Sequence, residues 1–248
     1  MTLFLRRLKW EQLLFWRNRE AAVFVFVFPP LLYLLLGAVY NDDIDGLPAA
    51  DVLLAGLVGY GCANTAFAGL AITQVIRREN GNLKRLRATP LPMATYFSAT
   101  VVSTLLVFTA QMLTTLGLGV VLYGAHAPKR PLEIAFLVVF GGLSFAGLGF
   151  GAAAMIRSAE GASAVVNLAV LPMAFLSGSF GPTRSYPEVL QKISELLPLT
   201  YFNRLLKQAY LLDRSIFNDT KSLAVVAAWG LAGYLLAWRR FTWSPRER

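Results

Sequence analysis

The hydrophobic residues of this chain are gathered into six long runs, which shorter polar segments separate. A helix needs about 20 apolar residues to cross the hydrocarbon core of a bilayer, at about 1.5 Å of rise per residue. Backbone exposed to lipid must satisfy its own hydrogen bonds, so each run is predicted to be a helix. The predicted spans are residues 21–40, 52–76, 95–123, 134–156, 162–180 and 222–238. The expected fold is an all-α integral membrane protein, with one transmembrane domain over residues 1–248.

Two segments outside the runs also carry helical patterns. Residues 1–20 mix basic residues with Trp10 and Trp16, which predicts an interfacial helix at the level of the lipid headgroups. In residues 184–214, apolar residues recur at helical spacing on both sides of Pro198. We expect two short external helices there, packed on or dipping into the outer leaflet. A solvated cap with no role beyond closure is the alternative.

The distribution of charge predicts the orientation in the membrane. The chain is 56% hydrophobic and carries a net charge of +9. Basic loops face the cytoplasm in membrane proteins, which explains this charge more simply than nucleic-acid binding does. Residues 1–20 and 77–90 each hold five Lys or Arg, whereas residues 41–51 hold none and four Asp. Both termini and residues 77–90 are therefore predicted to be cytoplasmic, in a multi-pass protein of the cell (inner) membrane. Residues 178–221 hold six Lys or Arg outside, but long loops obey this rule weakly.

The apolar cores of the predicted spans contain no Asp, Glu, Lys, Arg or His. Ion-coupled transporters and hydrophilic channels usually place ionisable residues there, so both classes are disfavoured. The strongest polar residues can hydrogen-bond between helices; they are Asn64, Thr65, Gln74, Gln111 and Asn167. Gly147 and Gly151 are spaced for close packing against another span or another subunit.

The sequence offers no catalytic, cofactor-binding or metal-binding residues. It contains no Gly-rich loop that ends in Lys-Ser or Lys-Thr, so it cannot hold ATP by a P-loop. With one cysteine (Cys62) and one histidine (His126), a disulfide framework and a Cys/His metal cluster are excluded. We interpret His126 as a solvated loop residue.

The basic segment carries a motif. It reads Glu79-Asn80-Gly81-Asn82-Leu83-Lys84-Arg85-Leu86-Arg87-Ala88-Thr89-Pro90-Leu91. The pattern Glu-x-x-Gly-Thr-Leu-Glu-x-Leu-x-x-Thr-Pro-Leu of ABC-2-type permeases, the membrane subunits of type-2 ABC exporters, is similar to it. Asn82 and Lys84 replace the usual Thr and acid, and one residue is missing before Gly81. The prolines around the exit of the fifth span (Pro172, Pro182, Pro187 and Pro198) and the six-span layout also resemble this family.

The resemblance implies a complex of two permeases with two copies of a separate ABC ATPase, which would hold ATP-Mg. Residues 77–90 would form the coupling helix that docks on the ATPase, with Leu83 and Leu86 packed into it. The residues expected to couple are Glu79, Gly81, Leu83, Lys84, Arg85, Leu86, Arg87 and Thr89, with Glu160 as a second contact. The charged residues among them would pair at the rim of this contact.

The family places the substrate path between two permeases, mainly along the second and fifth spans. The residues expected to line it are Asn64, Phe67, Asn167, Met173 and Phe175. A path without charge suits a hydrophobic or amphipathic cargo, such as a drug-like metabolite or a lipid. A permease for lipid-linked polysaccharide has the same expected fold. Two other classes stay open: a membrane scaffold or sensor, and a lipid enzyme built on the only acidic cluster, Asp42, Asp43, Asp45 and Asp51, which we interpret as a solvated loop.

Overall fold

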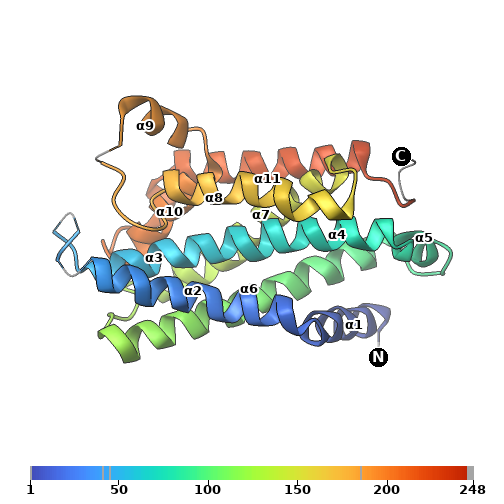
Figure 1. Cartoon of the computed structure of the whole chain (residues 1–248), viewed down its shortest axis with the longest axis horizontal. Helices are drawn as coiled ribbons and strands as arrows, with labels where there is room; N and C mark the ends of the chain where they lie inside the picture. The colour runs from blue at the N-terminus through green and yellow to red at the C-terminus, as the bar shows by residue number, and fades with distance from the viewer. Residues whose placement is uncertain (1, 41, 45, 185, 245–248) are drawn as a thin grey trace.

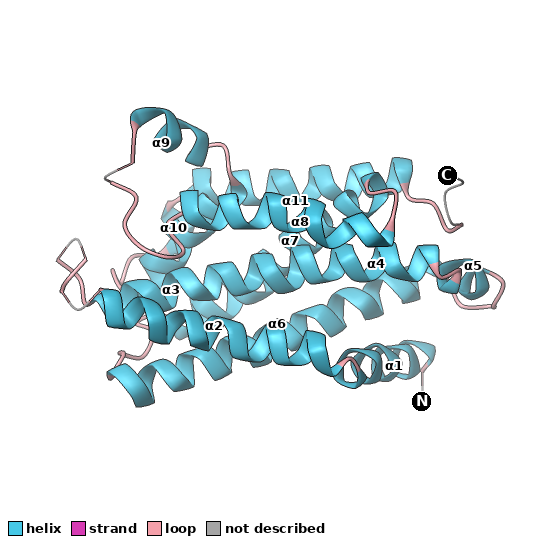
Figure 2. Ribbon diagram, viewed as in Figure 1, coloured by secondary structure: helices cyan, strands magenta, loops and turns pink. Residues whose placement is uncertain are grey.

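A computed structural model describes residues 2–40, 42–44, 46–184 and 186–244. Asp45 and the two ends of the predicted domain therefore lie outside the described residues. The described residues form helices and no strand; one isolated bridge joins Ile44 and Leu47. The long helices run along the long axis of the molecule (Figures 1 and 2). They are α1 (Leu3–Arg17), α2 (Arg19–Val39), α3 (Ala49–Cys62), the π-helix η1 (Ala63–Gly69), α4 (Leu70–Glu79), α5 (Asn82–Arg87), α6 (Met93–Tyr123), α7 (Pro131–Met155), α8 (Ala159–Leu176), α9 (Glu188–Ser194), α10 (Pro198–Tyr210), the 3₁₀ turn η2 (Ile216–Asn218) and α11 (Thr220–Arg240).

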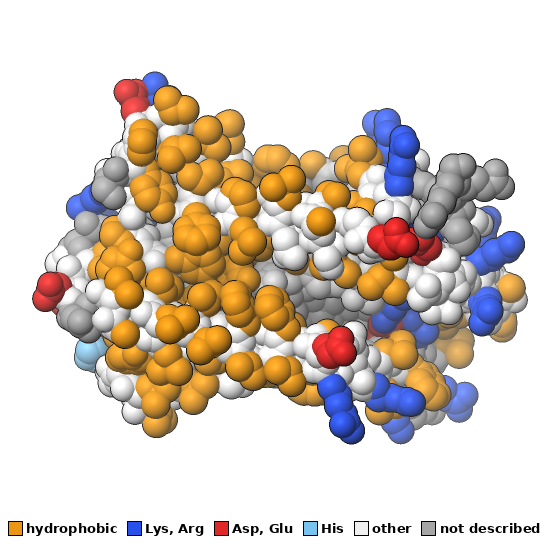
Figure 3. Space-filling view, viewed as in Figure 1, with side chains coloured by type: hydrophobic (Ala, Val, Ile, Leu, Met, Phe, Trp, Pro, Cys, Tyr) orange, Lys and Arg blue, Asp and Glu red, His pale blue; other side chains and the backbone are white. Residues whose placement is uncertain are grey.

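Six helical stretches are long and apolar enough to cross a membrane, as the hydrophobic runs predict. They are α2, the continuous helix α3–η1–α4, α6, α7, α8 and α11. Apolar side chains cover the middle of the molecule, and the charged ones gather at its two ends (Figure 3). The fifth span ends at Leu176, four residues before the predicted end, because the chain turns where Gly178 takes a φ of +70°. Only glycine adopts that conformation readily.

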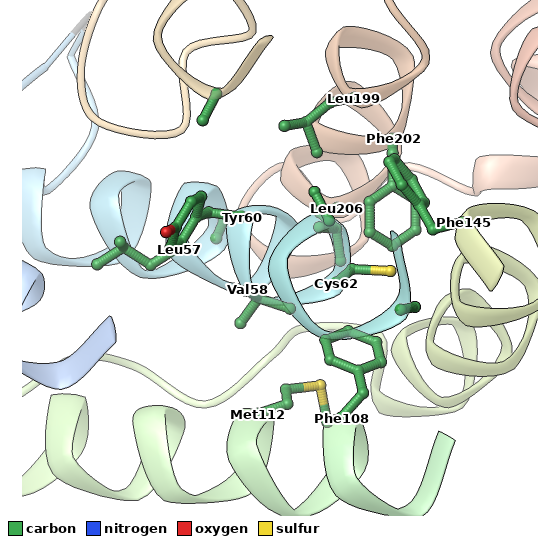
Figure 4. Close-up of a cluster of buried hydrophobic side chains, with 14 of the residues drawn as sticks. Leu57, Val58, Tyr60, Cys62, Phe108, Met112, Phe145, Leu199, Phe202 and Leu206 are labelled. Atoms are coloured by element: carbon green, nitrogen blue, oxygen red, sulfur yellow. The ribbon is translucent and has the colours of Figure 1, made fainter. Parts of the chain in front are cut away.

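The second span is the centre of the bundle. Its most apolar part is 94% buried inside the chain, whereas the corresponding parts of α2, α8 and α11 are each 28% buried. Side chains of α3 meet those of α6, α7 and α10 around Cys62, which is itself fully buried (Figure 4). Glycines allow this close approach: a Cβ at Gly59 would lie 1.8 Å from Asn203 Oδ1, and one at Gly61 would lie 2.3 Å from Gln111 Oε1.

Two short helices form in the predicted external segment, but they differ in burial. Val189 in α9 is 67% exposed, and Leu196, just beyond the end of α9, is 68% exposed. The apolar face of α10 instead packs into the bundle, where Phe202, Leu205, Leu206 and Ala209 are at most 1% exposed. Figure 1 shows α9 and α10 at the end of the molecule opposite to α1 and α5. Thus α10 closes one end of the core as an internal element.

The predicted small-residue contact lies within the chain. A Cβ at Gly147 would lie 2.3 Å from the carbonyl oxygen of Gly230, and one at Gly151 would lie 2.9 Å from that of Gly233. These two glycines of α7 therefore bring α11 into backbone contact. The alternative that they face another subunit is not what the structure shows.

Candidate functional site

Three consecutive residues at the end of α4 bind three different helices. The first, Arg77, forms a bidentate ion pair with Glu11 of α1. Its Nη1 lies 3.1 Å from Oε1 of Glu11, and its Nη2 lies 2.7 Å from Oε2. Arg7 also donates to the Glu11 carboxylate and lies over the ring of Tyr96. Glu11 is only 4% exposed. The pairing therefore fixes α1 to the end of the second span through buried charges.

Arg78 reaches the end of α7. It is 1% exposed, and its guanidinium donates to the carbonyl oxygens of Ala153, at 2.8 Å, and of Ile156. The last carbonyls of a helix lack partners within the helix and carry a partial negative charge. A buried arginine satisfies them and neutralises that charge. Arg78 thus ties α4 to the C-terminal end of α7.

Glu79 reaches the start of α8. Its carboxylate accepts a hydrogen bond from the backbone N–H of Ala159, the first residue of that helix. An acidic group is favourable at a helix N-terminus because the first N–H groups have no partners in the helix. Glu160, the next residue, is exposed at the same end. Glu160 therefore lies at the end of α8 that Glu79 contacts, and its role as a second contact with a partner stays a prediction.

The short helix α5 follows directly after this end of α4, which the three contacts hold in place. Gly81 makes the turn between α4 and α5 with a φ of +72°. Leu83 is only 1% exposed, so it holds α5 against its own chain. A six-residue helix is not stable alone, which gives this contact a physical reason. The outward surface includes Lys84, Arg85, Arg87 and Thr89, which are exposed, and Leu86, which is half-buried.

This geometry changes two expectations about the segment. Leu83 was expected to pack into a partner, and Glu79 to pair at the rim of that contact. Leu83 is instead buried within the chain, and Glu79 is bonded to α8. Lys84, Arg85, Leu86, Arg87 and Thr89 stay accessible in whole or in part, so they form the part of the predicted surface that can meet another protein. The Thr89 hydroxyl donates to the carbonyl oxygen of Leu86 at 2.7 Å and closes the helix.

Sequence reasoning missed the internal role of Glu11, Arg77 and Arg78. The predicted spans contained no charge, but the helix of the second span is longer than predicted, from Ala49 to Glu79, and includes both arginines. The available signal was that Glu11 is the only acidic residue among the first nineteen. Within a basic, amphipathic segment, a lone acid is a reason to search for a cation partner.

Asp51 corrects another expectation. It was interpreted as part of a solvated loop, but it lies in the first turn of α3 and is 6% exposed. Its carboxylate accepts from the backbone N–H of His126 at 2.9 Å and lies 2.8 Å from His126 Nδ1. The His126 ring is largely exposed, and its carbonyl oxygen accepts from the Tyr210 hydroxyl. Burial, with Asp51 nearby, raises the pKa of Tyr210, which keeps this hydroxyl a neutral donor. Asp51 therefore joins the start of α3 to the loop between α6 and α7. No group of three or more His, Cys, Asp or Glu in the described part of the chain could hold a metal ion.

The five residues predicted to line a path divide into two groups. Asn64 and Phe67 lie in η1, where Asn64 is buried and Phe67 half-buried. In α8, Met173 is buried, but Asn167 and Phe175 are exposed. The exposed side of α8 also carries Leu168, which is 77% exposed. Within one chain, these residues therefore do not enclose a common cavity.

Comparisons with known proteins agree with this architecture. Residues 2–211 match the family model described as ABC-2 type transporter. The "Probable multidrug ABC transporter permease YbhR" of Escherichia coli (strain K12) is 29% identical over 167 residues, which are 66% of this chain and 45% of that protein. The chain thus spans about half the length of that relative. The "Putative transport permease YvfS" of Bacillus subtilis (strain 168) is 22% identical over 223 residues, which are 89% of each chain. The family match covers most of the chain, and with the six apolar helices it shows that this multi-pass membrane protein belongs to the ABC-2 type transporter family.

Proposed function

We propose that this chain is the membrane subunit of an ATP-driven exporter that moves a hydrophobic or amphipathic molecule. The observation that carries this proposal is the attachment of α5. Its outward surface is basic, and the residues that precede it are fixed to α1, α7 and α8 by Arg77, Arg78 and Glu79. A force applied to α5 would therefore reach three other helices at once. Membership of the permease family supports a separate ABC ATPase as the protein that applies this force.

The proposed contact uses Lys84, Arg85, Leu86, Arg87 and Thr89, with Glu160 beside them. Charged groups at the rim of an interface set its orientation and rate of association more than its affinity. Leu86 is a half-buried apolar side chain of this surface that a partner could cover further. ATP-Mg would bind to the partner, which makes this chain a transport subunit without catalysis of its own.

We further propose two copies of the chain in the complex. The outward faces of α2 and α8 are apolar, and Val27, Leu35, Leu168 and Phe175 are all more than half exposed. A second copy could cover such a face and place Asn64, Phe67, Asn167, Met173 and Phe175 along a shared path. The printed name of the E. coli relative, a probable multidrug permease, supports a drug-like or lipid-like cargo. The basic end of the bundle with α1 and α5 would then be cytoplasmic, in accord with the positive-inside rule.

Charge reversal on α5 tests the proposal. The permease would be expressed with an ABC ATPase encoded beside it, purified in detergent and assayed for a stoichiometric ATPase and for transport in vesicles. Arg85→Glu with Arg87→Glu should reduce the retained ATPase at least tenfold, because both side chains are exposed on α5. The matched control is Arg239→Glu with Arg240→Glu, the same change of charge at the end of α11. Full retention of the ATPase and normal transport in the α5 variant would contradict the proposal.

A further inference from the structure

A cavity of about 320 Å³ lies between α1, α2, the second span and α6. None of the five predicted path residues lines it. The surface is hollowed between α2 and α4 at this position (Figure 3). Its volume is at the lower end of the range of pockets that bind drug-sized molecules, about 300–1,000 Å³. The size therefore suits one small molecule.

The cavity has apolar walls and a polar side. Side chains of Leu14, Phe15, Val25, Leu70 and Val107 supply the apolar surface. The second span supplies Thr65 and Gln74 to the polar side, and α6 supplies Ser103. Thr65 and Gln74 are nine residues apart on one helix, which is about 13 Å along its axis. An amphipathic molecule would match this division.

Two buried groups at the cavity wall lack hydrogen-bond partners. The hydroxyl of Thr65 is one, and Nε2 of Gln74 is the other. Thr65 is 6% exposed and Gln74 1% exposed. The Gln74 carbonyl oxygen already accepts from the Tyr96 hydroxyl at 2.6 Å, so its free group is the N–H₂ donor. Buried donors are normally paired, so each of these two groups is a candidate hydrogen-bond donor to a molecule in the cavity.

The charge beside the cavity favours an acceptor as well. Glu11 and Arg77 line its polar end, and Arg7 binds the same carboxylate. One carboxylate thus faces two guanidinium groups, which leaves one positive charge in excess. Nε of Arg7 is a further buried donor without a partner. A cation would find no carboxylate available here.

We propose that this cavity binds a drug-sized amphipathic molecule whose polar end is neutral or anionic and accepts a hydrogen bond from Gln74, while a second acceptor further along the molecule binds Thr65. The apolar body of the molecule lies against Leu14, Phe15 and Val25, and its polar end lies beside Arg77 and Asn82. This inference goes beyond the proposed function, because it concerns binding to the chain alone and needs no ATPase.

Protection of an introduced cysteine tests the proposal. Asn82 is exposed and lines the cavity, whereas Ala88 is exposed on the same basic segment and does not line it. The native Cys62 is fully buried and should react slowly. The rate of labelling by N-ethylmaleimide would be measured for Asn82→Cys and Ala88→Cys in detergent. The anionic probe 8-anilinonaphthalene-1-sulfonate should slow labelling at position 82 at least threefold and leave position 88 unchanged. The cation ethidium should protect neither position.

Second substitutions identify the groups that bind. Thr65→Val keeps the shape of the side chain, and Gln74→Leu removes the free donor; each should abolish protection at position 82. Gln111→Leu is the matched control, because Gln111 is equally buried but lies outside the cavity. It should leave protection intact. Equal slowing at both cysteines, equal protection by ethidium, or full protection in the Thr65→Val variant would overturn the proposal.

Discussion

At the scale of the residue, the end of α4 shows how one short sequence can hold several helices. Successive residues of a helix point about 100° apart, so Arg77, Arg78 and Glu79 face three directions. Each finds a partner of the right kind: a carboxylate, the carbonyls at a helix end, and an N–H at a helix start. The sequence could predict that this segment is basic. It could not predict that two arginines point inward, because Glu11 lies 66 residues from Arg77 and Ala153 lies 75 residues from Arg78 in the chain.

The buried carboxylate of Glu11 should be important for stability. Glu11→Gln leaves Arg77 and Arg7 without their anion, and the loss of one partner from a buried ion pair costs about 3–5 kcal/mol. Arg77 keeps 14% of its side chain exposed, so we expect a value of about 3 kcal/mol. Thermal unfolding of the purified protein in detergent measures it.

The control for Glu11 is an ion pair of the same type on the surface. Glu188 and Lys192 of α9 form an ion pair with each other, and their side chains are 80% and 73% exposed. Exposed pairs contribute little, so Glu188→Gln should change stability by no more than about 0.5 kcal/mol. If both substitutions shift the unfolding transition equally, the buried pair does not hold α1 in place.

At the scale of the element, hydrophobic length predicted the six spans, because the thickness of the bilayer dictates it. The same pattern also predicted two helices in the external segment. It did not predict that α10 enters the core, since an apolar face can meet lipid or protein with the same spacing. The pattern also could not show whether Gly147 and Gly151 contact another helix of the chain or another subunit. Those answers depend on which helices are neighbours, and spacing along one helix carries no information about that.

Replacing glycine by alanine should lower the stability at Gly147, in the contact between α7 and α11, and raise it at Gly117, outside that contact. A Cβ at Gly147 would lie 2.3 Å from a backbone oxygen of α11, so Gly147→Ala must push the helices apart. Overpacking of this kind costs about 1–3 kcal/mol. Gly117 of α6 has open space at its Cβ position, and Gly117→Ala should stabilise the helix by up to about 1 kcal/mol. Thermal unfolding of the two variants in one detergent compares them; a loss of stability at Gly117 as large as that at Gly147 would contradict the packing argument.

At the scale of the whole molecule, the burial of the spans is uneven. The second span is enclosed by the chain, whereas α2, α8 and α11 leave most of their apolar surface uncovered. Such surface must meet lipid or another copy. The residues of the predicted path, Asn64, Phe67, Asn167, Met173 and Phe175, do not converge in one chain, so the path would need the second copy that we propose. The sequence could predict the helices on which these residues lie. It could not predict whether their side chains come together to enclose a site.

The orientation in the membrane gives the last prediction. The loop between α2 and α3 and the end of α11 lie at opposite ends of the molecule (Figure 1). Asp43 in that loop and Ser244 after α11 are both exposed, and the only native cysteine is fully buried. Asp43→Cys should therefore react with a membrane-impermeant maleimide added to intact cells. Ser244→Cys should react only after the membrane is permeabilised, because the positive-inside rule predicts a cytoplasmic location for the arginines at the end of α11. The reverse result would place α5 outside, where no ATP-driven partner could reach it, and would exclude the proposed coupling contact.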